Sequence, residues 1–381
     1  MNTSMKNKPI WQPDYTITPA TASGLMEIEA ARAVLAQVTL PVAVQAELRR
    51  RARLRSTHYS TRIEGNRLTL QEAQEVIDER RTTFHGRERD VAEVRNYWNA
   101  LLRVEEWAAE KTPMTEKLIQ RLHALIEHGV RARPTPYRDG QNVIRDSASG
   151  KIVYMPPVAK DVPHLMAAMV NWDNKAEEEG LPAPLIAAIV HYQFATIHPY
   201  YDGNGRTARL LATFTLHRGG YGLNGLLSLE VYHARDLDKY YHALAVHPHH
   251  NYYFGRGAAD ISSWVEYFIG TLAAVFTTVR DEVLRSKGDT TAAALAEPDA
   301  LRCLDQRART VLALFLRTDR ITTADVAGAL GLSDRMARVL LGRWVEDGWL
   351  EVADPSRRAR AYLLSASYRQ FIGSLSAMGS E

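Results

Sequence analysis

One stretch of twelve residues, HPYYDGNGRTAR at 198–209, gathers the residue types that phosphate chemistry uses. It contains a histidine, a carboxylate, two glycines and two arginines. An imidazole can take up a proton, a carboxylate can hold a divalent cation, and arginine side chains bind phosphate oxygens. Glycines let a phosphate approach the backbone closely. The spacing therefore indicates a single site for a base, a metal ion and phosphates.

Two helices are needed to position these residues. Proline disfavours helical backbone at the residue before it, so Pro199 predicts that the apolar helix beginning near Pro184 ends at His198. The glycines allow a sharp turn before a second helical pattern, ARLLATFTLHR, at 208–218. DGNG at 202–205 then lies at a helix N-terminus, where free N–H groups and the positive end of the helix dipole bind anions.

Each residue of this stretch also has an ordinary structural interpretation. His198 alone would be a packed helix-end histidine, the glycines alone would be turn residues, and two arginines alone would form a solvated face. Asp202 would repel a polyphosphate unless a cation lay between them, so we expect it to hold Mg²⁺. The dense combination favours the functional interpretation.

Residues 198–206 resemble the signature of the Fic family, HPFx[DE]GN[GK]R, with Tyr200 in place of phenylalanine. The resemblance implies a mainly α fold, a Fic-type helical bundle with a β-hairpin flap, that transfers AMP from ATP to a Tyr, Thr or Ser hydroxyl of a protein. His198 would be the general base, and Mg²⁺ would be the cofactor. The ATP-binding residues implied in this stretch are Asp202, Gly203, Asn204, Gly205, Arg206, Thr207 and Arg209.

Two further segments extend the expected ATP site. Short β-type runs at 142–145 and 152–154 around a polar turn predict a hairpin. The family resemblance makes it the flap that pairs with the target, and DKYYHAL at 238–244 is similar to the adenine-pocket helix. A hairpin without a ligand and a tyrosine that serves only the core are the alternatives. The residues concerned are Val143, Ile144, Arg145, Tyr240 and Tyr241.

STRIEGN, at 60–66, resembles the inhibitory motif [ST]xxxE[GN] of self-restrained Fic proteins. Ser60, Glu64 and Gly65 fit it, on an inhibitory helix expected at about 41–65. We expect Glu64 to pair with Arg209 and to keep that arginine from the γ-phosphate. The alternative is a solvated glutamate near a helix C-terminus, where a negative charge is disfavoured unless it is compensated.

Helical patterns and breaks predict four regions. They are an N-terminal helical region with the inhibitory helix (1–110), a Fic catalytic domain (111–285), a small and polar linker (286–300) and a C-terminal domain (301–381). In the last region, three helical patterns followed by two short runs predict a winged helix-turn-helix. Ser333 would cap its recognition helix, whose inner side would be Leu340, Leu341, Trp344 and Val345.

Five arginines of the C-terminal domain could contact DNA phosphates: Arg335, Arg338, Arg357, Arg358 and Arg360. The alternative is that they solvate one face, while the domain packs against a partner or a second copy of the chain, which would make a homodimer. Arginine clusters alone are weak evidence for DNA binding.

Composition is that of an ordinary globular protein, with 381 residues, 46% hydrophobic, 24% charged and a net charge of +3. The single cysteine, Cys303, cannot form an internal disulfide. The longest apolar stretch, PLIAAIVHYQFATI at 184–197, is too short and interrupted to span a bilayer. We expect a cytoplasmic protein without a membrane partner.

Three functions remain open at this point. The first is a self-inhibited protein adenylyltransferase that uses ATP and acts on an unidentified target protein or on itself. The second is transfer of another nucleotide, phosphocholine or phosphate on the same scaffold. The third is a transcriptional regulator whose winged helix binds DNA and whose Fic core is a sensor or is idle. The intact catalytic positions argue against an idle core.

Overall fold

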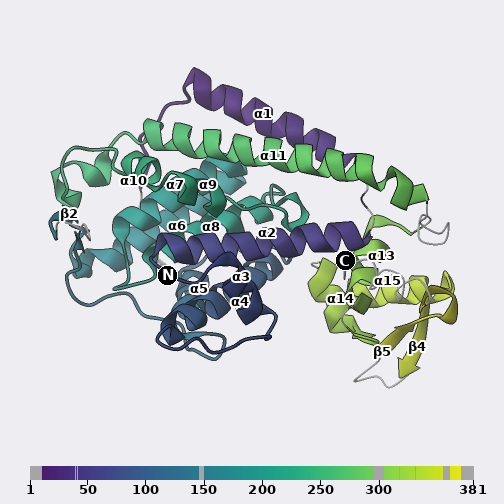
Figure 1. Cartoon of the computed structure of the whole chain (residues 1–381). Coiled ribbons are helices and arrows are strands. Elements are labelled where there is room, and N and C mark those ends of the chain that lie inside the picture. The colour runs from purple at the N-terminus through teal and green to yellow at the C-terminus, as the bar shows by residue number, and fades with distance from the viewer. Residues whose placement is uncertain are drawn as a thin grey trace, which may run out of the picture. The chain divides into compact units, whose positions relative to one another are not determined.

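The computed structural model describes residues 11–38, 40, 42–145, 150–295, 304–316, 318–330, 332–354 and 361–369. The chain divides into two units (Figure 1). The first comprises Met1–Leu35, Arg51–Glu105 and Pro113–Arg280, and the second comprises Ala36–Arg50, Glu106–Thr112 and Asp281–Glu381. The boundaries expected from the sequence remain predictions.

The first unit is helical. Its elements, four of which also include residues of the second unit, are α1 (Pro19–Ala36), α2 (Val42–Ile63), α3 (Leu70–Ile77), α4 (Glu88–Ala109), α5 (Glu116–His128), α6 (Val162–Glu178), α7 (Ala183–Ile197), α8 (Asn204–Arg218), α9 (Glu230–Arg235), α10 (Leu237–Leu244) and α11 (Ser262–Leu295). Short 3-10 turns lie at Ala159–Asp161, Leu223–Gly225, Tyr252–Phe254 and Arg256–Ala258. The predicted mainly α fold is confirmed.

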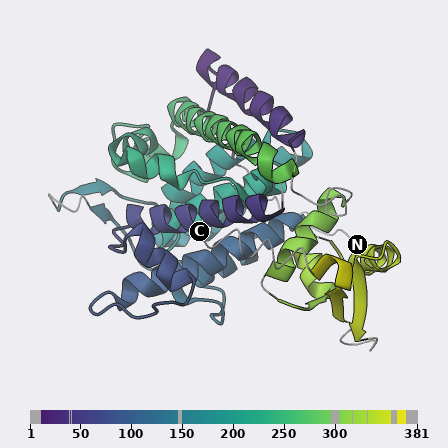
Figure 2. The same cartoon turned by 45° about the vertical axis from the view of Figure 1, so that its right-hand side comes forward.

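The centre of the first unit is the pair α7 and α8, which pack side by side. Almost every residue of both helices is buried, including Phe194 and Phe214. A helix that is apolar all round must be enclosed by other elements, which explains the long apolar run 184–197. In the two views of Figures 1 and 2, α1 lies alongside α11, where a Cβ on Gly24 would come within 2.9 Å of Ile269 Cγ2.

The predicted hairpin is present. Strand β1 (Ile144–Arg145) pairs antiparallel with β2 (Ile152–Tyr154), and the turn residues 146–149 lie outside the described part of the chain. The buried Tyr154 donates its hydroxyl to the Thr196 carbonyl, at 2.6 Å, near the end of α7. This bond ties the base of the hairpin to the helix that carries His198.

The C-terminal elements of the second unit follow the predicted order of helices and hairpin. They are α13 (Gln306–Leu312), the 3-10 turn Ala313–Leu316, β3 (Ile321–Thr322), α14 (Thr323–Leu330), α15 (Asp334–Glu346), β4 (Leu350–Asp354) and β5 (Ala361–Leu364), with sheet order β3-β5-β4. Ser333 caps α15 by accepting the Met336 N–H, as predicted. The winged-helix assignment itself stays a prediction.

The residues expected on the inner side of α15 do face its core. Leu341 and Trp344 are buried, with Leu340 and Val345 packed against the same cluster. Of the five arginines expected at DNA, Arg335 and Arg338 are exposed on α15. Arg357, Arg358 and Arg360 lie outside the described residues.

The sequence predicts that the helical pattern ends at about 285, before the linker at 286–300, but α11 continues as a helix to Leu295. The segment TTAAAL at 290–295 is small and polar in part, but alanine and leucine are the strongest helix formers, and the first proline after it is Pro298. Helix propensity therefore outweighed the loop-like composition. Residues 296–300 lie outside the described part of the chain.

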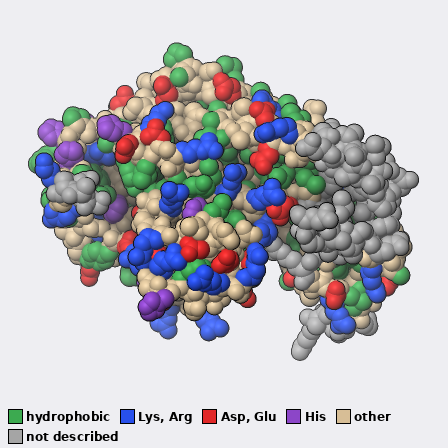
Figure 3. All heavy atoms as spheres, in the orientation of Figure 1, with side chains coloured by type: hydrophobic (Ala, Val, Ile, Leu, Met, Phe, Trp, Pro, Cys, Tyr) green, Lys and Arg blue, Asp and Glu red, His purple; other side chains and the backbone are tan. Residues whose placement is uncertain are grey.

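On the face shown in Figure 3, basic and acidic side chains are interspersed. No helix in the described part of the chain has the length and apolar character that crossing a membrane requires.

Candidate active site

His198 stands directly after the last residue of α7, as predicted. Its backbone is left-handed, with φ of 53°, which is uncommon for a residue other than glycine. The buried Arg138 holds it there: Nε donates to the His198 carbonyl at 2.9 Å, and Nη1 donates to the Gly140 carbonyl at 2.9 Å. The third nitrogen of this guanidinium donates to the Pro157 carbonyl beyond the hairpin. Arg138 is a supporting residue that carries no recognisable motif and that the sequence analysis missed.

The His198 imidazole is suited to accept a proton. Its Nδ1 lies 3.3 Å from the Ala195 carbonyl, so in the tautomer that donates this bond Nε2 carries the free lone pair. Burial lowers the pKa of His198 to about 4. The ring is therefore neutral throughout the physiological range and available as a base.

Asn204 locks the loop between the two helices. Its Oδ1 accepts the Tyr200 N–H at 3.0 Å, and its Nδ2 donates to the Tyr200 carbonyl at 2.8 Å. Tyr200 is itself buried and stacks on His123, with ring centroids 3.6 Å apart. Tyr200 and Asn204 thus hold the loop in its conformation, and the Asn204 amide is already hydrogen-bonded to the Tyr200 backbone.

Helix α8 begins at Asn204 with an open N-terminus. Its N-cap is Gly203, whose φ is 73° and which makes no side-chain cap hydrogen bond. The Thr207 hydroxyl turns back to the Gly203 carbonyl at 2.8 Å. An uncapped helix start leaves N–H donors for an anion, as the sequence predicts.

Two carboxylates approach the start of α8 where only glycine leaves room. A Cβ on Gly205 would lie 2.2 Å from Glu64 Oε1, and a Cβ on Gly203 would lie 2.4 Å from Glu127 Oε1. Both distances are shorter than any real contact of that kind. The glycines therefore permit close approach, as expected, and in this structure the approaching anions are carboxylates of the chain itself.

The predicted ion pair between Glu64 and Arg209 is present, with Oε1 and Nη2 2.9 Å apart. Ser60 completes the contact, since Arg209 Nε donates to its hydroxyl at 2.8 Å and Nη2 donates to its carbonyl at 2.9 Å. Burial disfavours the charged guanidinium, but Glu64, Tyr240 and Tyr97 together outweigh this and raise the pKa of Arg209. Gly65, with φ of 92°, turns the chain away after the helix. Two of the three motif residues, Ser60 and Glu64, thus contact α8, and Gly65 forms the turn after them.

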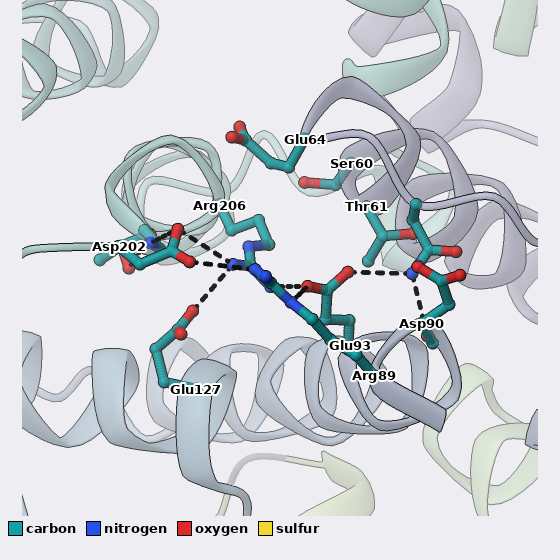
Figure 4. A network of polar contacts seen from close by, with 12 residues as sticks. Ser60, Thr61, Glu64, Arg89, Asp90, Glu93, Glu127, Asp202 and Arg206 are labelled. Carbon is teal, nitrogen blue, oxygen red and sulfur yellow. Dashed lines mark hydrogen bonds and ion pairs between the residues drawn. The ribbon is translucent and has the colours of Figure 1, made fainter. Parts of the chain in front are cut away.

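Arg206 differs from Arg209 although both belong to one motif. Its side chain is only 2% exposed, and Nη2 lies 2.9 Å from Glu127 Oε1. Glu93 and Asp202 lie at 3.6 Å from the same guanidinium, and Figure 4 shows it surrounded by these three carboxylates. Glu93 on α4 and Glu127 on α5 were missed, because no motif surrounds them in the sequence.

Asp202 is the accessible carboxylate of the site, with 59% of its side chain exposed. Its Oδ1 accepts the Gly203 N–H at 2.7 Å, and its Oδ2 lies 3.1 Å from Arg89 Nη2. Among the described residues, no group of three or more His, Cys, Asp or Glu could hold a metal ion. A single carboxylate fits Mg²⁺ when substrate phosphates supply further oxygens, which is how Mg²⁺ is commonly bound.

The two tyrosines expected at adenine differ in position. Tyr240 is buried, and its hydroxyl lies 3.2 Å from His191 Nε2. Tyr241 is 47% exposed, and its ring centroid lies 5.3 Å from that of Tyr240. Tyr241 can therefore meet a ligand, whereas Tyr240 belongs to the core beneath it.

The hairpin residues lie beside the signature loop. Asn142 links the two, because its Nδ2 donates to the Tyr200 carbonyl at 3.1 Å. Val143 and Ile144 are partly buried, and Arg145 is exposed, with Nη1 donating to the Gly150 carbonyl at 3.0 Å. The hairpin edge is thus adjacent to the loop that follows His198.

Comparison with known proteins gives the same family as the motif. Residues 113–216 match the family model described as Fic/DOC family. The protein adenylyltransferase Fic of Drosophila grimshawi is 29% identical over 205 residues, which cover 52% of this chain and 40% of that protein. The Drosophila virilis protein of the same name is 32% identical over 165 residues, 43% of this chain and 33% of that protein. The chain thus spans well under half the length of these relatives.

Solved structures agree in fold. A Fic family protein from Desulfovibrio desulfuricans G20 has a TM-score of 0.57 at 29% identity, covering 93% of this chain and 99% of that chain. A Fic domain containing signalling protein from Bacteroides thetaiotaomicron VPI-5482 has a TM-score of 0.58 at 24% identity, covering 71% and 97%. Residues 113–216 of the chain therefore form a Fic/DOC family domain, which includes the signature loop.

Proposed function

We propose that the chain transfers AMP from ATP to a hydroxyl side chain of a target protein, and that Glu64 restrains this activity. The observation that carries the proposal is the Glu64 carboxylate, which lies against Gly205 at the start of α8 and pairs with Arg209. A carboxylate there takes the place that a phosphate group would need. The names of the Drosophila relatives support the reaction class.

The residues of α8 and its loop would bind the triphosphate. The N–H groups at the start of the helix face the phosphates, and Arg209 joins them once Glu64 has moved away. Asp202 would hold Mg²⁺ together with phosphate oxygens, and the ion would neutralise charge on the phosphates. The exposed ring of Tyr241 would cover the adenine.

His198 would perform the proton transfer. Its neutral ring takes the proton from the target hydroxyl while that oxygen forms a bond to the α-phosphorus. The bond from the α-phosphorus to the bridging oxygen of pyrophosphate breaks, and the negative charge that develops on pyrophosphate faces the start of α8. The hairpin would hold an extended segment of the target by backbone pairing beside His198.

Labelling with radioactive ATP tests the reaction. The full chain and Glu64→Gly are incubated with Mg²⁺ and either α-labelled or γ-labelled ATP, with bacterial lysate as a source of targets. We expect protein labelling, including labelling of the chain itself, from the α-label alone, and loss of that labelling in Glu64→Gly with His198→Ala. Label from the γ-position would instead establish phosphate transfer, and an unlabelled product of higher mass would establish another group.

A second partner, duplex DNA, is proposed for the C-terminal elements because Arg335 and Arg338 are exposed on α15. Arg338 also lies 3.7 Å from Asp334 in the same helix, which reduces the charge it presents. Fluorescence anisotropy with duplex DNA at several salt concentrations tests this proposal. Affinity should fall steeply as salt rises, because bound phosphates release counterions. Absent or salt-insensitive binding would favour a protein partner or a second copy of the chain.

A further inference from the structure

One buried carboxyl has no part in the proposed chemistry. Glu230, the first residue of α9, is only 1% exposed. Its Oε2 accepts the Ser56 hydroxyl at 2.6 Å, and its Oε1 accepts the Tyr97 hydroxyl at 3.1 Å. Burial raises the pKa of Glu230. Burying a carboxyl costs free energy, and this cost is offset only when hydrogen-bond partners are held in place around it.

The partner Ser56 belongs to a row of polar residues on α2. Ser56, Ser60 and Glu64 recur at intervals of four, which places them on one face of the helix or its extension. Ser60 and Glu64 contact Arg209, and Ser56 contacts Glu230. One face of α2 therefore meets two buried groups that can carry charge, one from α8 and one from α9.

Tyr97 on α4 is a second partner of Glu230, and it lies close enough to Arg209 for the arginine charge to act on it. Its side chain is fully buried, and its hydroxyl donates to Glu230. Burial and Glu230 raise the pKa of Tyr97, whereas the charge of Arg209 opposes that rise. The Tyr97 hydroxyl is therefore influenced by the charges of both Glu230 and Arg209. Hydrogen bonds thus join Ser56 and Tyr97 to Glu230, and one helical turn further along α2 Ser60 is joined to Arg209.

We propose that Glu230, with Tyr97, is a positioning residue that anchors α2 through Ser56 and thereby holds Glu64 on Arg209. If α2 shifts, Glu230 loses the Ser56 hydroxyl and is left buried with fewer partners, so these hydrogen bonds favour the position of α2 that blocks the phosphates. Ser56 precedes Glu64 by two helical turns, about 12 Å along the axis, so the anchor acts without touching the nucleotide. The consequence for AMP transfer rests on the proposed function.

Hydrogen–deuterium exchange of the full chain tests the anchor without any need for activity. Glu230→Gln and Ser56→Ala are compared with Asp173→Asn, a matched control that removes another buried carboxylate, one paired with Arg218 at 2.9 Å. Backbone amides of residues 56–64 should exchange about tenfold faster in the two anchor variants, because local opening loses a buried hydrogen bond. The control should leave these amides unchanged.

Unchanged exchange of 56–64 in both anchor variants would overturn the proposal. If Glu230→Gln fails to fold, Ser56→Ala carries the test, since it leaves the carboxyl with Tyr97. Faster exchange of the same amides in Asp173→Asn would also overturn it, because the effect would then be general destabilisation.

A double-mutant comparison links the anchor to Glu64. Glu230→Gln should raise α-label incorporation about fivefold in the wild-type chain and should give no further rise in Glu64→Gly, because both changes release the same restraint. A lower rate in both backgrounds would make Glu230 a structural residue only. If Glu64→Gly incorporates no label, the proposed function fails, whereas the exchange result still decides the anchor.

Discussion

Near the start of α8 the same arrangement occurs twice: a glutamate lies against a glycine and pairs with an arginine of the helix. The two glutamates differ in exposure and in the number of neighbouring carboxylates. On one side, Glu64 lies against Gly205 and pairs with Arg209, and 29% of its side chain is exposed. On the other side, Glu127 lies against Gly203 and pairs with Arg206, with 17% of its side chain exposed. Arg206 has two further carboxylates within 3.6 Å. The same pattern of a glycine beside an arginine thus holds Glu64 as the one described carboxylate paired with its arginine, and Glu127 as one of a cluster of three.

The origin of the two glutamates explains the difference. Glu64 follows the last residue of α2, where the chain turns at Gly65, so a small shift of one helix end can remove it. Glu127 lies inside α5, whose Leu118, Leu122 and Leu125 are buried in the core. Removing Glu127 from α8 would require a core helix to move, which is far more costly.

The largest expected effect tests whether His198 acts as the general base once Glu64 no longer occupies Arg209. In the Glu64→Gly background, His198→Ala should lower the rate of AMP transfer by about 10³-fold, because general base catalysis is lost. The affinity for ATP should change by less than about twofold, since the imidazole handles the target proton rather than the nucleotide. Rates come from α-label incorporation and affinities from calorimetry. A rate within tenfold of the parent would remove the assignment of His198 as base.

Next, Glu64→Gly and Glu127→Gln should differ in their rates of AMP transfer. Glu64→Gly should raise AMP transfer by about 10²-fold, or ~2.7 kcal/mol, because Arg209 becomes free for phosphate. Glu127→Gln should give no rise, because Glu93 and Asp202 still surround Arg206. Both are measured as initial rates of self-modification.

The control for that comparison is Glu64→Gly with Arg209→Ala, in which the gain should disappear. Equal rates for wild type and Glu64→Gly across a range of targets would contradict the restraint by Glu64. A rise in Glu127→Gln would show that the two sides of α8 are equivalent.

Stability should separate the two sides by their response to nucleotide. Glu127→Gln should lower the free energy of unfolding by about 2 to 3 kcal/mol, because a buried guanidinium loses its nearest partner. Glu64→Gly should lower it by a similar amount, about 2 to 3 kcal/mol, because the equally buried Arg209 loses its carboxylate partner. Mg²⁺-ATP should restore this loss, since bound phosphate replaces the missing anion. Denaturant titrations with and without Mg²⁺-ATP measure both. The comparison fails if the nucleotide restores Glu127→Gln equally well.

The smallest effect concerns pH. Burial lowers the pKa of His198 to about 4, so the ring stays neutral as pH falls from 8 to 5.5 and transfer by Glu64→Gly should lose less than about twofold through this group. An inflection near pH 6.5, the ordinary value for histidine, would show that the ring is more accessible to solvent than the structure indicates. Since the folded pKa lies below the unfolded one, stability contributed by neutral His198 is lost as pH falls from about 6.5 to about 4.

Local sequence decided the frame of the site. Pro199 ends α7 at His198, and the glycines of DGNG start α8, because backbone conformation at proline and glycine depends on the residues themselves. The Glu64–Arg209 pair was predicted as well, but only through motif resemblance, since no local rule joins residues 145 positions apart. The end of α11 shows the limit of local reasoning, because small polar residues were taken for a linker that the helix occupies.

Only the tertiary structure decided which charged side chains are buried and which side chains surround them. The sequence names Arg206 and Arg209 as equals, but packing places three carboxylates within 4 Å of Arg206 and one described carboxylate, that of Glu64, at Arg209. Arg138 at the His198 carbonyl and Glu230 behind α2 carry no motif either. The physical reason is that the cost of a buried charge depends on neighbours brought from distant helices, and their positions are set only when the core packs.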